Sequence, residues 1–147
     1  MKSKKNIVII DSNFILLPFQ FKIDYFDEIR FKIEGEIRFI IYQQIIDELE
    51  AKKKRERRTT NFIRYFESGL SYLEKNTQKY NIEILSDTKE VHESTDNFLL
   101  RMLKTLKNEN QNIYLATNDS DLRSKAREIK INTIFMRQKK YLSIDFA

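Results

Sequence analysis

The chain has 147 residues, of which 41% are hydrophobic and 33% are charged, and its formal net charge is +5. This length and apolar content suit one folded domain over residues 1–147 and exclude a disordered chain. With no cysteine and a single histidine, His92, the sequence excludes disulfides, zinc–thiolate sites and cysteine nucleophiles, so any bound metal must rest on oxygen ligands.

Strand-like and helix-like segments alternate along the chain. The first, 6–10, is short, β-branched and apolar, which is typical of a strand buried on both faces. Such alternation indicates an α/β fold with a mostly parallel sheet and helices on both of its faces. The pattern predicts a helical turn at 12–17 closed by Pro18, strands at 37–41, 81–85, 113–116 and 131–136, helices at 24–31, 43–54, 61–76, 94–107 and 121–129, and a short edge strand at 141–146.

The sequence shows no sign of membrane insertion or export. No apolar run approaches the roughly 18 residues that a membrane-spanning helix needs. The basic segment 1–5 is followed by only a short apolar run before Asp11, which is typical of a first strand rather than a signal peptide. We therefore expect a cytoplasmic protein without a membrane segment.

Five acidic residues lie at the edges of the predicted apolar segments. Three of them follow strands, one opens a helix, and one lies beside the buried stripe of helix 43–54. In open α/β sheets ligands bind beyond the carboxyl ends of the strands, and carboxylates gathered there repel one another unless a cation lies between them. The sequence therefore predicts a site for Mg²⁺ or Mn²⁺ formed by Asp11, Glu48, Asp96, Asp119 and Asp121.

Each of these acids also has a purely structural interpretation. Asp11 and Asp119 could cap helices, since aspartate is favoured at that position. Asp96 and Asp121 could be first-turn acids that the helix dipole stabilises, and Glu48 could be a surface residue. Their joint placement at one predicted edge of the sheet favours the metal site.

A run of basic residues follows the predicted helix that carries Glu48. Six of the seven residues from 52 to 58 are lysine or arginine, and the run starts one turn beyond Glu48. It could guide phosphates toward the acids, although a solvated helix end would have the same composition. The net positive charge likewise favours an anionic partner. The candidate nucleic-acid-binding residues are Lys52, Lys53, Arg55, Arg57, Arg58 and Arg123.

Four short segments resemble the motifs of PIN-domain nucleases. They are VIIDSN at 8–13, IIDEL at 45–49, TD at 95–96 and LATNDSDL at 115–122, and the last is the most specific. The opening of the first motif is similar to the archaeal branch related to ribosomal-RNA-processing PIN proteins. The resemblance implies a three-layer α/β/α fold around a central five-stranded parallel sheet ordered 3-2-1-4-5.

The same resemblance implies hydrolysis of RNA through one or two Mg²⁺ or Mn²⁺ ions. It assigns catalysis to Asp11, Glu48, Asp96 and Asp119, with Asp121 as an auxiliary metal ligand. Asp47 and Glu50 lie close enough in the sequence to compete with Glu48 for its assignment. Residues expected to tune the site through hydrogen bonds are Ser12, Thr117 and Asn118.

Two other functions are compatible with this pattern. The first is a non-catalytic PIN-like scaffold that binds RNA during RNA processing, and the intact acids count against it. The second is a receiver-like phosphotransfer domain, but the paired acids at the end of the first strand and the downstream lysine that it needs are missing. A homodimer and an antitoxin or RNA-processing partner are further expectations from the resemblance.

Overall fold

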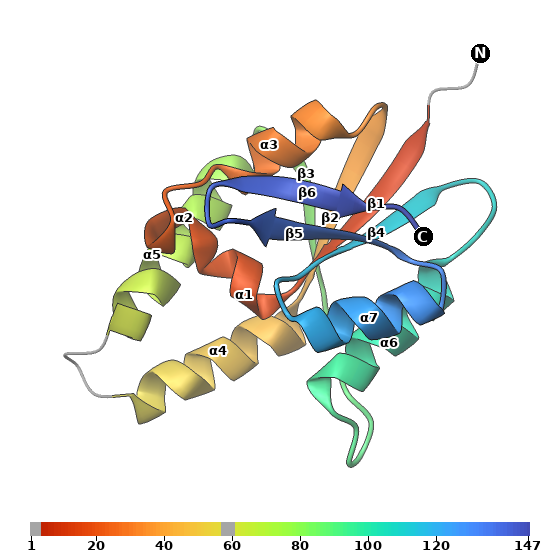
Figure 1. Cartoon of the computed structure of the whole chain (residues 1–147). Helices are drawn as coiled ribbons and strands as arrows, with labels where there is room; N and C mark the ends of the chain where they lie inside the picture. The colour runs from red at the N-terminus through yellow and green to blue at the C-terminus, as the bar shows by residue number, and fades with distance from the viewer. Residues whose placement is uncertain (1–3, 57–60) are drawn as a thin grey trace.

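The centre of the computed structural model, which describes residues 4–56 and 61–147, is a six-stranded sheet (Figure 1). The strand order is β3-β2-β1-β4-β5-β6; the first five strands are parallel, and β6 pairs antiparallel with β5. The predicted α/β fold with strands ordered 3-2-1-4-5 is confirmed, with β6 added at one edge. The strands are β1 (Lys5–Ile10), β2 (Glu36–Tyr42), β3 (Asn81–Leu85), β4 (Asn112–Ala116), β5 (Asn132–Arg137) and β6 (Tyr141–Asp145).

Strand β1 lies at the middle of the parallel sheet because its side chains are apolar on both faces. Val8 is fully buried and is in register with Phe39 of β2 on one side and Tyr114 of β4 on the other. A strand covered on both faces reads as a continuous apolar run rather than an alternating one. The sequence pattern of 6–10 therefore identified the central strand correctly.

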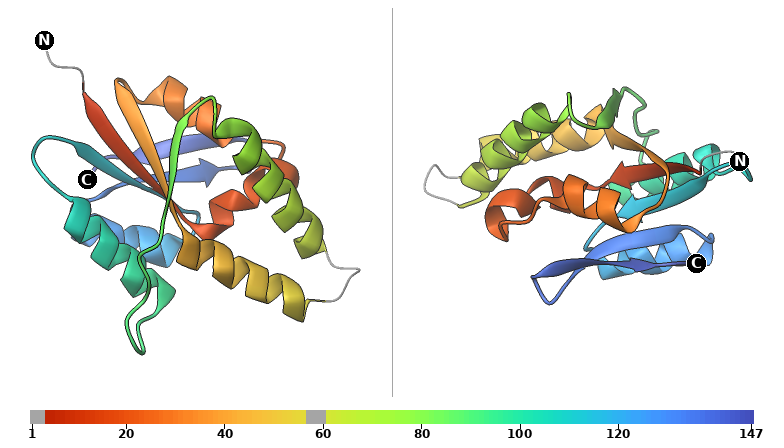
Figure 2. Two further views of the ribbon diagram at one scale, coloured as in Figure 1. Left: turned by 180° about the vertical axis from the view of Figure 1, so that it is seen from behind. Right: turned by 90° about the horizontal axis from the view of Figure 1, so that it is seen from above.

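Helices cover both faces of this sheet, as the two views in Figure 2 show. Phe26 of α3 packs edge-on against Phe39 with ring centroids 4.8 Å apart, and Phe98 of α6 packs against Tyr42 at 5.2 Å. Phe39 and Tyr42 are three residues apart in one strand, so they point to opposite faces. The helices are α1 (Ser12–Ile15), α2 (Leu17–Gln20), α3 (Tyr25–Lys32), α4 (Gln43–Arg55), α5 (Asn61–Asn76), α6 (Thr95–Leu106) and α7 (Ser120–Glu128).

The prediction that Pro18 closes a helical turn was wrong. Pro18 lies in the first turn of α2, a second short helix that follows α1 after Leu16. Proline is accepted there because the backbone N–H groups of a first helical turn have no partner within the helix. Pro18 therefore helps to start a helix rather than to end one.

Helix α1, which follows directly after β1, is held by close packing against α5. A Cβ atom added at Gly69 of α5 would lie 2.1 Å from the carbonyl oxygen of Ile15, so only glycine allows this approach. The hydroxyl of Tyr72 on α5 also donates to Asp24, the N-cap of α3. These contacts fix the segment that begins at the carboxyl end of β1.

Several helices begin at one end of the sheet. In Figure 1, α1, α4 and α7 start together where β1, β2 and β4 end, and α6 lies alongside α7. The predicted ligand edge is thus the place where these helices meet. Within the described residues, no helix has both the length and the apolar character that crossing a membrane requires.

Candidate acidic site at the carboxyl edge of the sheet

Asp11 is the most buried of the five predicted acids, with an exposed fraction of 6%. It is the extended N-cap of α1, and its Oδ1 accepts a hydrogen bond from the backbone N–H of Ser12 at 2.7 Å. Burial raises the pKa of the Asp11 carboxyl, and the charges of Asp96 and Asp119 raise it further, against the lowering effect of hydrogen bonds from Thr117 and Ser12. Asp11 thus serves as the predicted cap and is also crowded by other acids.

A network of uncharged side chains fixes the orientation of Asp11. The Thr117 hydroxyl donates to Asp11 Oδ2 at 2.7 Å, and Asn13 Nδ2 lies 3.3 Å from the same oxygen and 3.2 Å from Thr117 Oγ1. Asn13 Oδ1 accepts from the backbone N–H of Asn118, and Asn118 Oδ1 accepts from the N–H of Met136. The network therefore ties the ends of β1 and β4 to β5.

Asn13 was not among the residues predicted to tune the site, although Thr117 and Asn118 were. Its partners lie 104 and 105 positions away in the sequence. Only its position two residues after Asp11, inside the VIIDSN motif, was a signal that could have found it. Ser12, which was predicted, contributes through its backbone N–H.

Asp119 and Asp121 lie at the start of α7. Asp119 is the N-cap, and its Oδ1 accepts from the backbone N–H groups of Asp121 at 2.9 Å and Leu122 at 3.1 Å. Its own N–H donates to Thr117 Oγ1, which links this cap to the Asp11 network. Asp121 is exposed and forms an ion pair of 3.3 Å with Lys125. The capping interpretation is thus correct for Asp119.

Asp96 lies half-buried in the first turn of α6. Burial raises its pKa, the charges of Asp119 and Asp121 raise it further, and Lys125 acts in the opposite direction. The charges of Asp96 and Asp119 thus act on Asp11, and the charge of Asp119 acts on Asp96. We call Asp11, Asp96 and Asp119 the acid rim. Asp121 is not part of the acid rim, but its charge contributes to the raised pKa of Asp96.

Glu48 is half-buried on α4 and has a different set of neighbours. The Thr95 hydroxyl lies 2.7 Å from Oε2 and 3.0 Å from Oε1, and Lys89 Nζ lies 2.6 Å from Oε1. Since Thr95 directly precedes Asp96, Glu48 lies beside the acid rim. The two other acids considered for the assignment, Asp47 and Glu50, are both exposed. Glu48 is therefore the acid of α4 that faces α6.

The chemistry of the acid rim suits a hard divalent cation, although the site is not a closed cage. Carboxylate oxygens are the ligands that Mg²⁺ and Mn²⁺ prefer. A cation between the acids would offset the repulsion that, after burial, contributes to the raised pKa values of Asp11 and Asp96. Within residues 4–56 and 61–147, however, no three histidine, cysteine, aspartate or glutamate side chains are already grouped closely enough to hold a metal ion.

Four of the six predicted nucleic-acid-binding residues lie on two helices. Lys52, Lys53 and Arg55 belong to the last turn of α4; Lys53 pairs with Glu67 at 3.1 Å, and both lysines lie over phenylalanine rings of α5. Arg123 lies on α7 with its guanidinium 4.0 Å from the centroid of a phenylalanine ring in β5. Arg57 and Arg58 lie outside the described residues.

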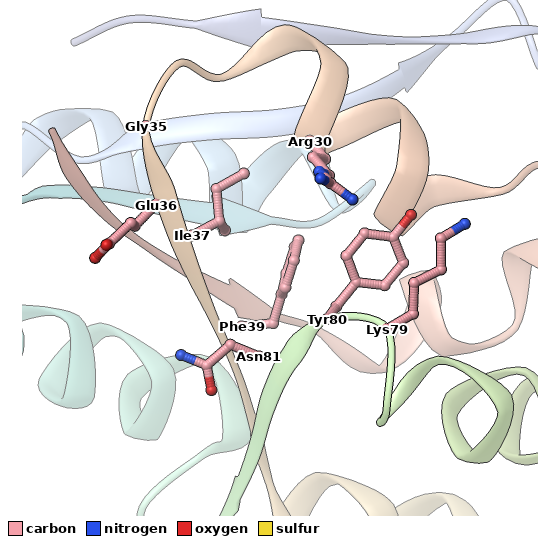
Figure 3. Close-up of a pocket in the computed structure, with 8 residues that line it drawn as sticks. All are labelled: Arg30, Gly35, Glu36, Ile37, Phe39, Lys79, Tyr80 and Asn81. Carbon is pink, nitrogen blue, oxygen red and sulfur yellow. The ribbon is translucent and has the colours of Figure 1, made fainter. Parts of the chain in front are cut away.

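A separate cavity lies at the other end of the sheet, where β2 and β3 begin. Figure 3 shows Arg30, Tyr80 and Lys79 side by side, with Glu36 and Asn81 turned away from them. Tyr80 is 8% exposed and its hydroxyl donates to Asp27, so its ring is part of the core. The acid rim and this cavity thus occupy opposite ends of the parallel strands.

The model of the PIN domain family matches residues 8–137, a range that includes all three residues of the acid rim and Glu48. The chain belongs to the PIN domain family. The predicted family, like the predicted fold, is therefore confirmed.

Three relatives of this PIN domain illustrate the resemblance. Ribonuclease VapC4 of Methanocaldococcus jannaschii is 28% identical over 137 residues, which cover 93% of this chain and 95% of that protein. The solved structure of the PIN domain endonuclease Utp24 has a TM-score of 0.67 at 21% identity and covers 96% of this chain and 92% of its own. A domain of a functionally unknown protein from Methanocaldococcus jannaschii has a TM-score of 0.63 at 17% identity, with 92% of each chain covered.

Proposed function

We propose that this PIN domain is an endoribonuclease that hydrolyses phosphodiester bonds of RNA with Mg²⁺ or Mn²⁺ bound at the acid rim. The observation that carries the proposal is the link between Asp11 and Asp119 at the carboxyl edge of the sheet, where the Thr117 hydroxyl donates to Asp11 Oδ2 and accepts from the N–H of Asp119. Asp96, in the first turn of α6, supports it, because its charge adds to the effect of burial on the pKa of Asp11. The similarity to ribonuclease VapC4 supports RNA as the substrate.

The acid rim supplies the residues that would hold the metal. Asp11, Asp96 and Asp119 would bind it directly, and Asp121 would be an auxiliary ligand. When bound, a divalent cation activates a water molecule and offsets the charge that develops on the phosphate. No protein nucleophile is needed, in keeping with the absence of cysteine and the exposed position of His92.

The uncharged network prepares Asp11 for this role. Thr117 and Asn13 both donate to Asp11 Oδ2, so the carboxylate is held in one orientation before a ligand arrives. Side chains that orient a metal ligand in this way raise affinity and activity because less reorganisation accompanies binding. Thr117, Asn13 and Asn118 are therefore proposed to position the ligand rather than to touch the substrate.

The basic end of α4 is proposed to bind the RNA backbone. Lys52 and Arg55 are exposed, and they lie on the helix that also carries Glu48. Contacts of lysine and arginine with phosphates give affinity without sequence preference and weaken with salt. Arg123 and the residues 57 and 58 are proposed to belong to the same interface.

An RNA cleavage assay with a matched pair of variants tests the proposed function. We expect Asp11→Asn to slow cleavage of a labelled RNA in Mg²⁺ or Mn²⁺ by about 10²–10³-fold, because several kcal/mol of charge stabilisation depend on a metal ligand. The control is Asp47→Asn, an exposed acid of α4 bonded to Gln43, which should cleave like the wild type. Equal cleavage by Asp11→Asn and the wild type would contradict the proposal.

A non-catalytic RNA-binding scaffold is a second candidate. It is favoured by the open arrangement of the acids in the described residues and by the pairing of Glu48 with Lys89. In that case RNA binding would survive both Asp96→Asn and Asp119→Asn, and the wild type would not cleave RNA with any divalent metal.

The remaining expectations about assembly and location stay predictions. We propose that residues 1–147 form one domain and that the protein acts in the cytoplasm. An antitoxin or RNA-processing partner and a homodimer follow from the family rather than from a contact in this chain. Size measurement of the purified protein, alone and with an RNA ligand, tests the oligomeric state.

A further inference from the structure

Lys89, in the segment between β3 and α6, holds its charge at the carboxyl edge of the sheet. Its Nζ lies 2.6 Å from Glu48 Oε1, and the two side chains are 29% and 32% exposed. An ordinary surface lysine keeps its ammonium group in water on a flexible stem. The fixed, half-buried position of Lys89 therefore requires an explanation.

Glu48 binds Lys89 and is itself held in place by hydrogen bonds from other side chains. Besides Lys89, its carboxylate accepts hydrogen bonds from Thr95 and, at 3.3 Å, from Gln44 Nε2. Gln44 Oε1 in turn lies 3.5 Å from the backbone nitrogen of Lys89. Glu48 and Gln44, one turn apart on α4, thus hold the lysine by both its side chain and its backbone.

The segment around Lys89 is also fastened from the α6 side. Arg101 of α6 bonds to both carboxylate oxygens of Glu93, at 2.8 and 2.9 Å, and to the carbonyl oxygen of Thr88 at 3.2 Å. Residues on each side of Lys89 are therefore tied to the same helix. A residue held from both sides can present its charge at a defined place.

That place lies next to the acid rim, since Thr95 binds Glu48 and the following residue is Asp96. An RNA strand that binds at the acid rim must bring its phosphate anions toward three carboxylates. A fixed cation beside the rim offsets the repulsion between phosphates and carboxylates. Lysine suits this task because it contacts phosphate as a compact point charge.

We propose that Lys89 binds a backbone phosphate of the RNA next to the acid rim, and that Glu48 is the positioning residue that holds it there. The inference rests on the proposed function, and it adds a substrate contact, Lys89, that is not one of the acids of the site.

Binding of a fluorescent 12-nucleotide single-stranded RNA in EDTA, measured over a range of salt concentrations, tests the proposal without cleavage. Losing one phosphate contact lowers the slope of log affinity against log salt by about 0.7. We expect this change for Lys89→Met, with affinity roughly three- to tenfold weaker at low salt, and a wild-type slope for Lys89→Arg. The matched control is Lys104→Met, which removes an exposed lysine from the last turn of α6.

The double variant Lys89→Met/Glu48→Gln separates phosphate binding from simple neutralisation of Glu48. If Lys89 contacts a phosphate, the double variant keeps the lower slope, whereas restored wild-type binding would overturn the proposal. So would a wild-type slope in Lys89→Met. Circular dichroism establishes that each variant is folded, and if Lys89→Met is not, Lys89→Gln takes its place. Failure of the wild type to bind or cleave RNA would instead overturn the proposed function itself.

Discussion

The two ends of strand β1 bury polar side chains in opposite ways. At the amino end Asn6 is 3% exposed, and its Nδ2 donates to the carbonyl oxygens of Glu34 and Glu36 at 2.9 and 3.0 Å. Its Oδ1 accepts from Asn112 Nδ2 at 3.2 Å. At the carboxyl end Asp11 is 6% exposed, and burial raises the pKa of its carboxyl group, to which the charges of Asp96 and Asp119 add.

This contrast distinguishes a structural polar residue from a functional one. The Asn6 amide is neutral and is matched to the carbonyl oxygens of Glu34 and Glu36 and to the side chain of Asn112, so its burial contributes to the pairing of β1 with β2 and β4. Asp11 is a carboxyl group placed where burial and neighbouring charges oppose its ionised form. A buried group whose ionisation the fold opposes is a candidate for ligand binding.

The largest expected effect comes from placing a buried carboxyl group at the amino end of β1, as Asp11 is placed at the carboxyl end. Asn6→Asp removes the two Nδ2 hydrogen bonds and places an acceptor against two carbonyl oxygens. We expect the free energy of unfolding to fall by about 3 kcal/mol, because buried donors and acceptors without partners are costly. Urea unfolding at neutral pH measures the loss.

The control for Asn6→Asp is the same change at an exposed position of the same end of the sheet. Asn81, the first residue of β3, is exposed, so Asn81→Asp should change the unfolding free energy by less than about 0.5 kcal/mol. Equal losses in the two variants would show that the hydrogen bonds of Asn6 are not what holds this end of β1.

A smaller effect is expected from loosening the carboxyl end. Asn13→Ala removes the amide that contacts Asp11, Thr117 and the N–H of Asn118. By analogy with residues that orient metal ligands, we expect kcat for RNA cleavage to fall about tenfold, within a usual range of about 10–100, while KM changes little. The exposed Asn97→Ala on α6 is the control. A rise in KM with unchanged kcat would instead place Asn13 in RNA binding.

The two ends of β1 also show what sequence alone can predict. The apolar run 6–10 and the acid after it were enough to place the central strand and Asp11, because a strand buried on both faces leaves a continuous apolar run in the sequence. The anchoring of Lys89 by Glu48 could not be predicted, since the two lie 41 positions apart and one is in a segment without periodicity. Pro18 was misplaced because proline is compatible with both the end and the start of a helix.

The smallest expected effect concerns Asp96 and changes with pH. Burial first, and then Asp119, raise the pKa of Asp96 above its ordinary value of 3.8. A carboxyl group with a raised pKa stabilises the fold most when it is protonated, and this contribution is lost as the pH rises through its folded pKa. In metal-free protein, ionised Asp96 therefore weakens the fold, whereas asparagine at the same position stays neutral.

We accordingly expect Asp96→Asn to raise Tm relative to the wild type in EDTA, with a difference that grows from about pH 3 to pH 6. Asn97→Ala, which removes no ionisable group, corrects for the effect of pH on the rest of the protein. Added Mg²⁺ should raise Tm of the wild type more than that of the variant, because a ligand stabilises only the fold that binds it. A Tm difference that does not depend on pH would mean that neither burial nor Asp119 opposes the ionisation of Asp96, which would then be an ordinary acid in the first turn of α6.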